Sequence, residues 1–317
     1  MVTVGIPKGL LFPKYHVFTS AFFDELGAQT VSSPDTNKTI LDLGTKYCVD
    51  DACLSIKVFH GHVAWLKDCC DFLFVPRIMG FKEREFICPM FCGLPEMLRH
   101  NITGLPHLID TPLASLQNDK LYTWAKNVGY RITHDKTVIK RAFNRAMQEQ
   151  SQFCPGINDT NYGQKIALLG HTYHIHDAFI NMDLIQKMND AGFGIITEEH
   201  VPASDKEAAV KRLFKKPFWS FFADYYGAAI HLYQTSAVDG FIYLSSFACG
   251  IDSILIELIK SETGEFPFLI IKLDEHTGEA GINTRLEAFL DLMKRRTHDD
   301  RYDSQPGEHQ YCGKSVV

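Results

Sequence analysis

The chain has 317 residues, 45% of them hydrophobic and 22% charged, and its formal net charge at pH 7 is −6. This composition is ordinary for a globular protein, and the acidic balance argues against the basic face that nucleic-acid binding requires. The length favours two domains, and the sequence contains neither a membrane-spanning stretch nor a signal-peptide pattern, so we expect a cytoplasmic protein.

The first half of the chain alternates short apolar runs with longer segments of helical spacing. The run Phe72 to Pro76 is continuously apolar, as is typical of a parallel strand buried on both faces. Further strands are expected at residues 2–6 and 28–32 and in a segment that ends near residue 110. Helices are expected at residues 14–26, 39–48, 58–66 and 121–150.

Residues 156–163 interrupt this pattern with Asn, Asp and Gly, which predicts a linker. The alternation then resumes, with strands expected at residues 165–169, 194–197, 238–245 and 268–273 and helices at 181–191, 254–260 and 285–295. Strand–helix alternation in both halves predicts an α/β protein with two Rossmann-like or flavodoxin-like domains built on parallel sheets. The expected domains are residues 1–155 and 164–300, followed by a polar tail at 301–317.

Nine cysteines are unusual for a chain of this length, and their odd number and irregular spacing argue against a disulfide framework in a reducing compartment. Each is therefore a buried apolar thiol, a metal ligand or a reactive thiol. The cysteines are Cys48, Cys53, Cys69, Cys70, Cys88, Cys92, Cys154, Cys249 and Cys312.

Three of these cysteines lie where parallel sheets place their functional sites, in loops after strands or ahead of helices. Cys88 follows the strand at 72–76 after a loop, Cys249 comes just past the strand at 238–245, and Cys53 stands at the start of a helix. A helix N-terminus offers unpaired backbone N–H groups and the positive end of the dipole, both of which stabilise thiolates.

Several histidines accompany the cysteines. Lys57, His60 and His62 follow Cys53 closely, and either a structural or a substrate-facing role fits them. His171, His174 and His176, with Asp177, could form a zinc site, although structural histidines are the more common case. Neither a dinucleotide fingerprint nor a P-loop occurs, so we expect no ATP binding by this chain.

Five separated segments resemble, in the same order, those of the acyl-CoA dehydratase activase-related proteins. This group is related to the 2-hydroxyacyl-CoA dehydratase subunits and to the double-cubane cluster proteins. The similarity runs from about residue 3 to about residue 293. The segments are residues 51–63, 74–77, 87–95, 238–250 and 273–287.

The resemblance implies an oxygen-sensitive iron–sulfur cluster in the cleft between the two domains. Cys53, Cys88 and Cys249 match the cysteine positions of the family, whereas Cys48 and Cys92 look like additions to them. Three thiolates on a 4Fe-4S cluster would leave one iron open to a substrate, and six thiolates could hold a bridged double cubane. A sixth ligand is not evident, so the number of irons stays open.

The resemblance also implies a function and a partner. We expect a reductase or dehydratase-like component that receives low-potential electrons from an actin-like, ATP-hydrolysing activator and reduces a small molecule. Lys57, His60 and Glu279 are the candidate catalytic residues at the open iron, and a homodimer is expected, without nucleic-acid or membrane partners. The alternatives are a non-catalytic cluster carrier or interaction subunit and, less favoured, a structural zinc protein.

Overall fold

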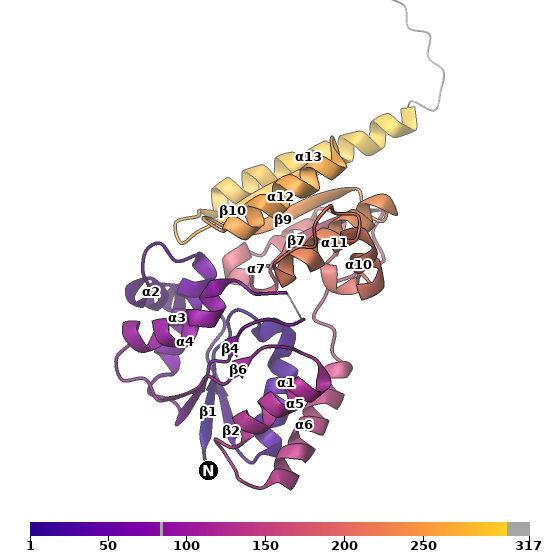
Figure 1. The fold of residues 1–317 in the computed structure, drawn as a ribbon. Coiled ribbons are helices and arrows are strands. Elements are labelled where there is room, and N and C mark those ends of the chain that lie inside the picture. Colours follow the sequence, from indigo (N-terminus) through magenta and orange to yellow (C-terminus); the bar gives the residue numbers. More distant parts are fainter. Residues whose placement is uncertain (83–84, 303–317) are drawn as a thin grey trace, which may run out of the picture. The chain divides into compact units, whose positions relative to one another are not determined.

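The computed structural model describes residues 1–82 and 85–302, with side chains to residue 296 (Figure 1). Residues 1–277 form one compact unit, and helix α13 (Glu279–Tyr302) belongs to a second unit that begins at Gly278. Residues 303–317 of the predicted polar tail, and with them Cys312, lie outside the described residues. No helix within the described ranges is both long and apolar enough to cross a membrane.

The N-terminal half contains a four-stranded parallel sheet of order β2-β1-β3-β5. Its strands are β1 (Thr3–Ile6), β2 (Gln29–Ser32), β3 (Phe72–Phe74) and β5 (His107–Ile109). A short parallel pair, β4 (Arg77–Ile78) with β6 (Pro112–Leu113), continues from β3 and β5. The helices are α1 (Phe12–Glu25), α2 (Lys38–Tyr47), α3 (Leu54–Leu66), α4 (Pro89–Asn101), α5 (Asn118–Gly129) and α6 (Lys136–Ser151).

The C-terminal half contains a second four-stranded parallel sheet of order β10-β9-β7-β8. Its strands are β7 (Gln164–Gly170), β8 (Phe193–Ile196), β9 (Gly240–Ser246) and β10 (Phe268–Leu273). The helices are α7 (Thr172–Ile175), α8 (Ala178–Asn181), α9 (Leu184–Asp190), η1 (Glu198–His200), α10 (Ala203–Val210), α11 (Ser220–Gln234) and α12 (Gly250–Thr263). Two parallel sheets with intervening helices confirm the predicted α/β class.

One hydrophobic cluster joins the two halves. It includes Phe59 of α3 and Phe91 of α4 from the first half and Tyr225 of α11 and Tyr243 of β9 from the second. Burial of apolar surface is the main stabilising contribution to a fold, so the two sheets support each other within residues 1–277. The division into domains 1–155 and 164–300 stays a prediction.

The expected helix at 121–150 is two helices, α5 and α6, because Asp135 caps the start of α6. Its carboxylate accepts hydrogen bonds from the backbone N–H groups of Thr137 and Val138. In a continuous helix these two N–H groups would instead donate to backbone carbonyl oxygens of the preceding turn. The sequence analysis does not predict helix α11. Most faces of this helix are buried, so its sequence lacks the alternation of polar and apolar stripes that marks an amphipathic helix.

Helix α3 is the most enclosed helix of the N-terminal half: every residue except Trp65 is buried. Helix α2 crosses it at two glycines, since a Cβ on Gly44 would overlap the carbonyl oxygen of Lys57 and a Cβ on Gly61 would overlap that of Ile40. The two backbones therefore pack in direct contact (Figure 1). This contact holds α3 against α2, and Cys53 immediately precedes α3.

We expect Gly44→Ala or Gly61→Ala to lower the free energy of unfolding by about 1–3 kcal/mol, because the added methyl group must push two backbones apart. Gly93→Ala is the matched control, since Gly93 is also inside a helix but no atom lies within 4 Å of an added Cβ. That control should be neutral or stabilising by up to ~1 kcal/mol. Urea unfolding followed by circular dichroism measures all three; equal stabilities would contradict the close contact.

Candidate cysteine site at three helix N-termini

The three cysteines that match the family pattern occupy the same position in three different helices. Cys53 is the N-cap of α3, Cys88 is the N-cap of α4, and Cys249 is the N-cap of α12. At an N-cap, the side chain lies beside the first backbone N–H groups of the helix, which have no carbonyl partner within it. Each sulfur is thus placed next to groups that favour negative charge.

The thiols of these cysteines lie close enough to affect one another's ionisation. Burial raises the pKa of Cys53, of Cys88 and of Cys249, the last to about 12. The neighbouring Cys53 thiol further raises the pKa of both Cys88 and Cys249. Backbone N–H groups of Ser55 and Ile56 oppose this effect at Cys53. The structure therefore brings the three cysteines, from both halves of the chain, into one site.

Cys48 and Cys92 lie beside this trio. Cys48 ends α2 and is buried, which raises its pKa to about 11, and the Cys53 thiol adds to this rise. Cys92 lies one turn into α4, where its thiol interacts with Cys88 and donates to the carbonyl oxygen of Ile78 at 3.3 Å. Both residues are therefore next to the site, but neither is the N-cap of a helix.

The remaining described cysteines have other surroundings. Cys69 is exposed, and Cys70 packs against Gly5 and donates to the carbonyl oxygen of Leu66. Cys154 is exposed, with its sulfur 3.8 Å from the Nε2 atom of His200.

The side chain of Lys57, one turn into α3, is almost fully buried and forms an ion pair with Glu275 in the segment after β10. Lys57 also interacts with the Cys48 thiol, so a positive charge lies at the edge of the cysteine site. Sequence reasoning selected Glu279 from the same stretch and missed Glu275. Glu279 is the first residue of α13, in the second compact unit.

His60 is fully buried and both of its ring nitrogens have partners. Nδ1 lies 2.8 Å from the carbonyl oxygen of Ile56, and Nε2 lies 3.2 Å from the side-chain nitrogen of Asn101. With Nδ1 donating and Nε2 accepting, a neutral ring satisfies both contacts and ties α3 to the end of α4. A catalytic role for His60 stays a prediction, and these contacts describe a structural one.

The histidines after β7 separate into different environments. The Nε2 atom of His174 lies 2.9 Å from Ser55 Oγ and 2.8 Å from Ser246 Oγ, which links α3 to β9. Asp177 caps α8 and accepts a hydrogen bond from Thr36. His174 and Asp177 therefore have hydrogen-bond partners of their own, and the His174 ring packs against that of His171 with centroids 6.0 Å apart. Among the described residues, His171 is the member of this group that joins a set of potential ligands.

That set consists of His171, Cys249 and Asp252, whose ligand atoms all lie within 4.8 Å of one another. His171 Nε2 is 3.2 Å from Asp252 Oδ1, which also accepts a hydrogen bond from the hydroxyl of Tyr243 at 2.9 Å. Burial alone would raise the pKa of Asp252, but its interaction with His171 lowers it below the usual range. The Cys249–Asp252 spacing, from N-cap to third helical residue, was a signal that sequence reasoning left unused.

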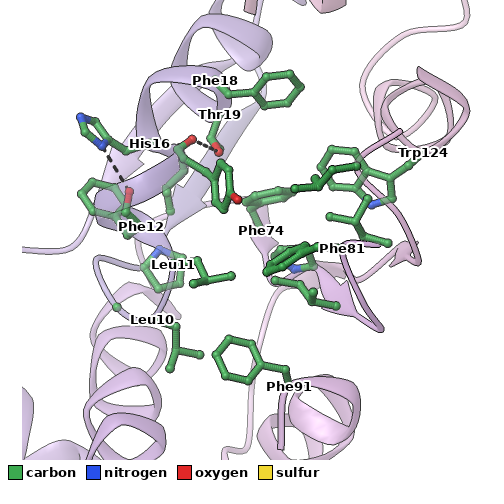
Figure 2. Close-up of a pocket in the computed structure, with 18 of the residues that line it drawn as sticks. Leu10, Leu11, Phe12, His16, Phe18, Thr19, Phe74, Phe81, Phe91 and Trp124 are labelled. Atoms are coloured by element: carbon green, nitrogen blue, oxygen red, sulfur yellow. Dashed lines mark hydrogen bonds between the residues drawn. The ribbon is translucent and has the colours of Figure 1, made fainter. Parts of the chain in front are cut away.

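An apolar cavity of about 290 Å³ borders the two cysteine-bearing helices of the N-terminal half. Figure 2 shows its walls, where aromatic rings such as Phe74, Phe81 and Phe91 surround the space. The Nδ1 atom of the His16 ring lies 3.2 Å from the carbonyl oxygen of Phe12, so this nitrogen is already engaged. The cavity is suited to an apolar group.

A second cavity, of about 500 Å³, is more polar and involves both halves of the chain. Leu54 and Ser55, directly after Cys53, line it together with Tyr173. Tyr173 in turn interacts with the thiols of Cys53 and Cys249 and packs against Phe91 with ring centroids 6.4 Å apart. The first cavity therefore reaches Phe91 and the second reaches Tyr173, which pack against each other beside the cysteine site.

A comparison with models of protein families identifies a family that matches most of the N-terminal two thirds of the chain. The family model described as CoA enzyme activase uncharacterised domain (DUF2229) matches residues 3–201, which is more than half of the chain. The chain belongs to this family. No curated protein matches the sequence. The predicted activase-related family is thus confirmed at this level, and the link to the double-cubane proteins stays a prediction.

The DUF2229 region includes two of the three N-cap cysteines, Cys53 and Cys88, and ends before Cys249. It also includes His171 but not Asp252. The matched family region therefore carries part of the site, and the remainder comes from the last strands and helices of this chain.

We expect the free energy of unfolding to fall as the pH drops from about 6.5 toward 4, in part through His62. Its ring nitrogens contact Ser33 Oγ at 2.8 Å and Thr36 Oγ1 at 3.1 Å, and burial lowers its pKa to about 4. The unfolded chain takes up a proton there first, so the native state loses up to ~1.4 kcal/mol per pH unit within this window.

Denaturant unfolding at a series of pH values measures this slope. His62→Gln, which keeps a polar side chain of similar size, should reduce the slope, whereas substitution of the exposed His134 should leave it unchanged. A slope identical in wild type and His62→Gln would contradict the neutral, buried assignment of His62.

Proposed function

We propose that this member of the CoA enzyme activase-domain family is an iron–sulfur protein that accepts low-potential electrons and reduces a small substrate. An ATP-hydrolysing activator of the actin-like type would supply the electrons, and a homodimer would be the working form. The observation that carries the proposal is the convergence of Cys53, Cys88 and Cys249, each the N-cap of a different helix.

The residues of the site fit an iron–sulfur cluster chemically. Cysteine thiolates are the usual cluster ligands, and hydrogen bonds to sulfur together with burial tune the reduction potential. The N-terminal N–H groups of three helices supply such donors, and the half-buried cysteines restrict access by water. Burial opposes thiolate formation at all three cysteines, and the Asp252 carboxylate raises the pKa of Cys249 further. A bound cation would reverse that effect, as metal ligation does for thiols in general.

A cluster at this site would supply one-electron chemistry at low potential. The chain's own residues would bind and orient the substrate. The polar cavity beside Ser55 and Tyr173 offers space next to the cysteines, and the apolar cavity behind Phe91 offers space for a hydrophobic part of the substrate. Lys57, held by Glu275, would place a positive charge at the edge of the site.

Cys48 and Cys92 bear on the number of irons. Both interact with members of the trio, but the Cys92 thiol donates a hydrogen bond to the carbonyl oxygen of Ile78, and neither residue is the N-cap of a helix. We therefore favour a single cluster with three protein thiolates and keep the bridged double cubane as the alternative.

We expect anaerobically prepared protein to be brown and to contain about four irons and four acid-labile sulfides per chain. Cys53→Ser, Cys88→Ser and Cys249→Ser should each lose most of the iron, because a serine oxygen is a poorer ligand for iron in a cluster. Cys154→Ser, at an exposed position away from the trio, is the control and should keep the full content.

Iron and sulfide analysis with low-temperature EPR measures these outcomes. Cys48→Ser and Cys92→Ser should keep about four irons, whereas loss of iron in either variant would favour the larger, bridged cluster. A colourless anaerobic protein, or full iron in Cys249→Ser, would contradict the proposal.

We expect the purified chain to hydrolyse no ATP, because its sequence contains neither a P-loop nor a dinucleotide-binding glycine pattern. Reduction of the cluster by a weak donor should require both ATP and an actin-like activator. Phosphate release and the loss of visible absorbance during anaerobic reduction measure the two steps, with activator alone and ATP alone as controls. Robust hydrolysis by the isolated chain would count against the division of labour.

A further inference from the structure

His171, Cys249 and Asp252 have the donor set of a mononuclear metal site. One imidazole nitrogen, one sulfur and one carboxylate oxygen lie within 4.8 Å of one another, on two segments that follow neighbouring strands β7 and β9. In a tetrahedral zinc site with bonds of about 2.0–2.3 Å, ligand atoms lie roughly 3.5 Å apart. Small side-chain rotations would bring the three atoms to that spacing.

Two buried polar atoms of the group have no hydrogen-bond partner among the described residues. They are Nδ1 of His171 and Oδ2 of Asp252, and the two residues are 4% and 0% exposed. Buried polar groups without partners are rare in native proteins and are commonly explained by an unseen ion or water. His171 Nε2 and Asp252 Oδ1 are engaged with each other, Asp252 Oδ1 also accepts from Tyr243, and the Ser245 hydroxyl and the Cys249 thiol interact with the same carboxylate.

The local charges favour a cation over any other ligand. The fully buried carboxylate of Asp252 lies within 4.8 Å of the Cys249 sulfur and of an imidazole nitrogen of His171. A carboxylate in a buried position is costly unless a positive charge compensates it, and a bound cation would supply that charge. The ring of His171 is stacked on Tyr173 with centroids 4.8 Å apart, which holds its orientation.

We propose that His171, Cys249 and Asp252 bind one divalent transition-metal ion of the zinc type when the cysteine trio holds no cluster. The mixed sulfur, nitrogen and oxygen donors suit Zn²⁺, and three protein ligands leave a fourth position open to water or another ligand. Binding displaces the Cys249 proton to solvent and requires no redox step. This site goes beyond the proposed function, and because it shares Cys249 with the cluster, the two occupants exclude each other.

Cobalt titration of metal-free protein tests the site, with Zn²⁺ affinity obtained by competition. We expect one Co²⁺ per chain with a thiolate-to-cobalt absorption band. His171→Ala and Asp252→Asn should weaken binding by roughly 100-fold or more, since even residues behind a ligand cost 10–100-fold. Cys249→Ser should abolish the band. His134→Ala, an exposed histidine, should change nothing.

Cys53→Ser and Cys88→Ser distinguish this site from the cluster, because they should lose iron yet bind cobalt with wild-type affinity and an unchanged band. Absence of a thiolate band in wild type, or full affinity in His171→Ala, would overturn the proposal. If His171→Ala does not fold, as judged by circular dichroism, loss of the band in Cys88→Ser would overturn it instead. Failure of wild type to take up iron and sulfide would refute the proposed function alone and leave the cobalt result standing.

Discussion

The hydrogen bonds of His174 constrain the geometry on which the site depends. Its buried ring lies between Ser55 of helix α3 and Ser246 at the end of strand β9, so a single nitrogen links α3 to the second sheet. Cys53 is two residues before Ser55 and Cys249 is three residues after Ser246. The contacts of His174 with these two serines therefore also keep the two cysteines near each other. The burial that permits this also lowers the pKa of His174 to about 3, so the linking ring stays neutral.

Around this link the molecule combines features that favour negative charge with features that oppose it. Helix N-termini and the Lys57 ammonium stabilise thiolates, whereas burial and the Asp252 carboxylate raise thiol pKa values. A site that is unfavourable for free thiolates and rich in sulfur, nitrogen and oxygen donors is well matched to a bound cation. The proposed cluster and the proposed single ion are two ways of meeting the same electrostatic requirement, and Cys249 is common to both.

The fold class and the trio Cys53, Cys88 and Cys249 followed from local signals: apolar strands, strand–helix alternation, and loops that precede helices. Asp252 and Glu275 did not, because their importance depends on contacts with His171 and Lys57, which are distant in the sequence. Helix α11 was missed since burial on most of its faces removes the polar stripe that reveals a helix. Contacts between residues distant in the sequence, and burial on all sides of a helix, arise only in the folded chain. The spacing of apolar residues in the sequence therefore does not reveal them.

The division of the site along the chain has a consequence for modularity. The matched family region ends at residue 201, whereas Cys249 begins α12, and Ser246, which faces the His174 ring, ends β9. A fragment of this protein that stopped at that boundary would keep two cysteines and lose the third together with the strand that positions it. A complete set of three cysteines in such a fragment would require a second polypeptide that supplies β9 and the start of α12.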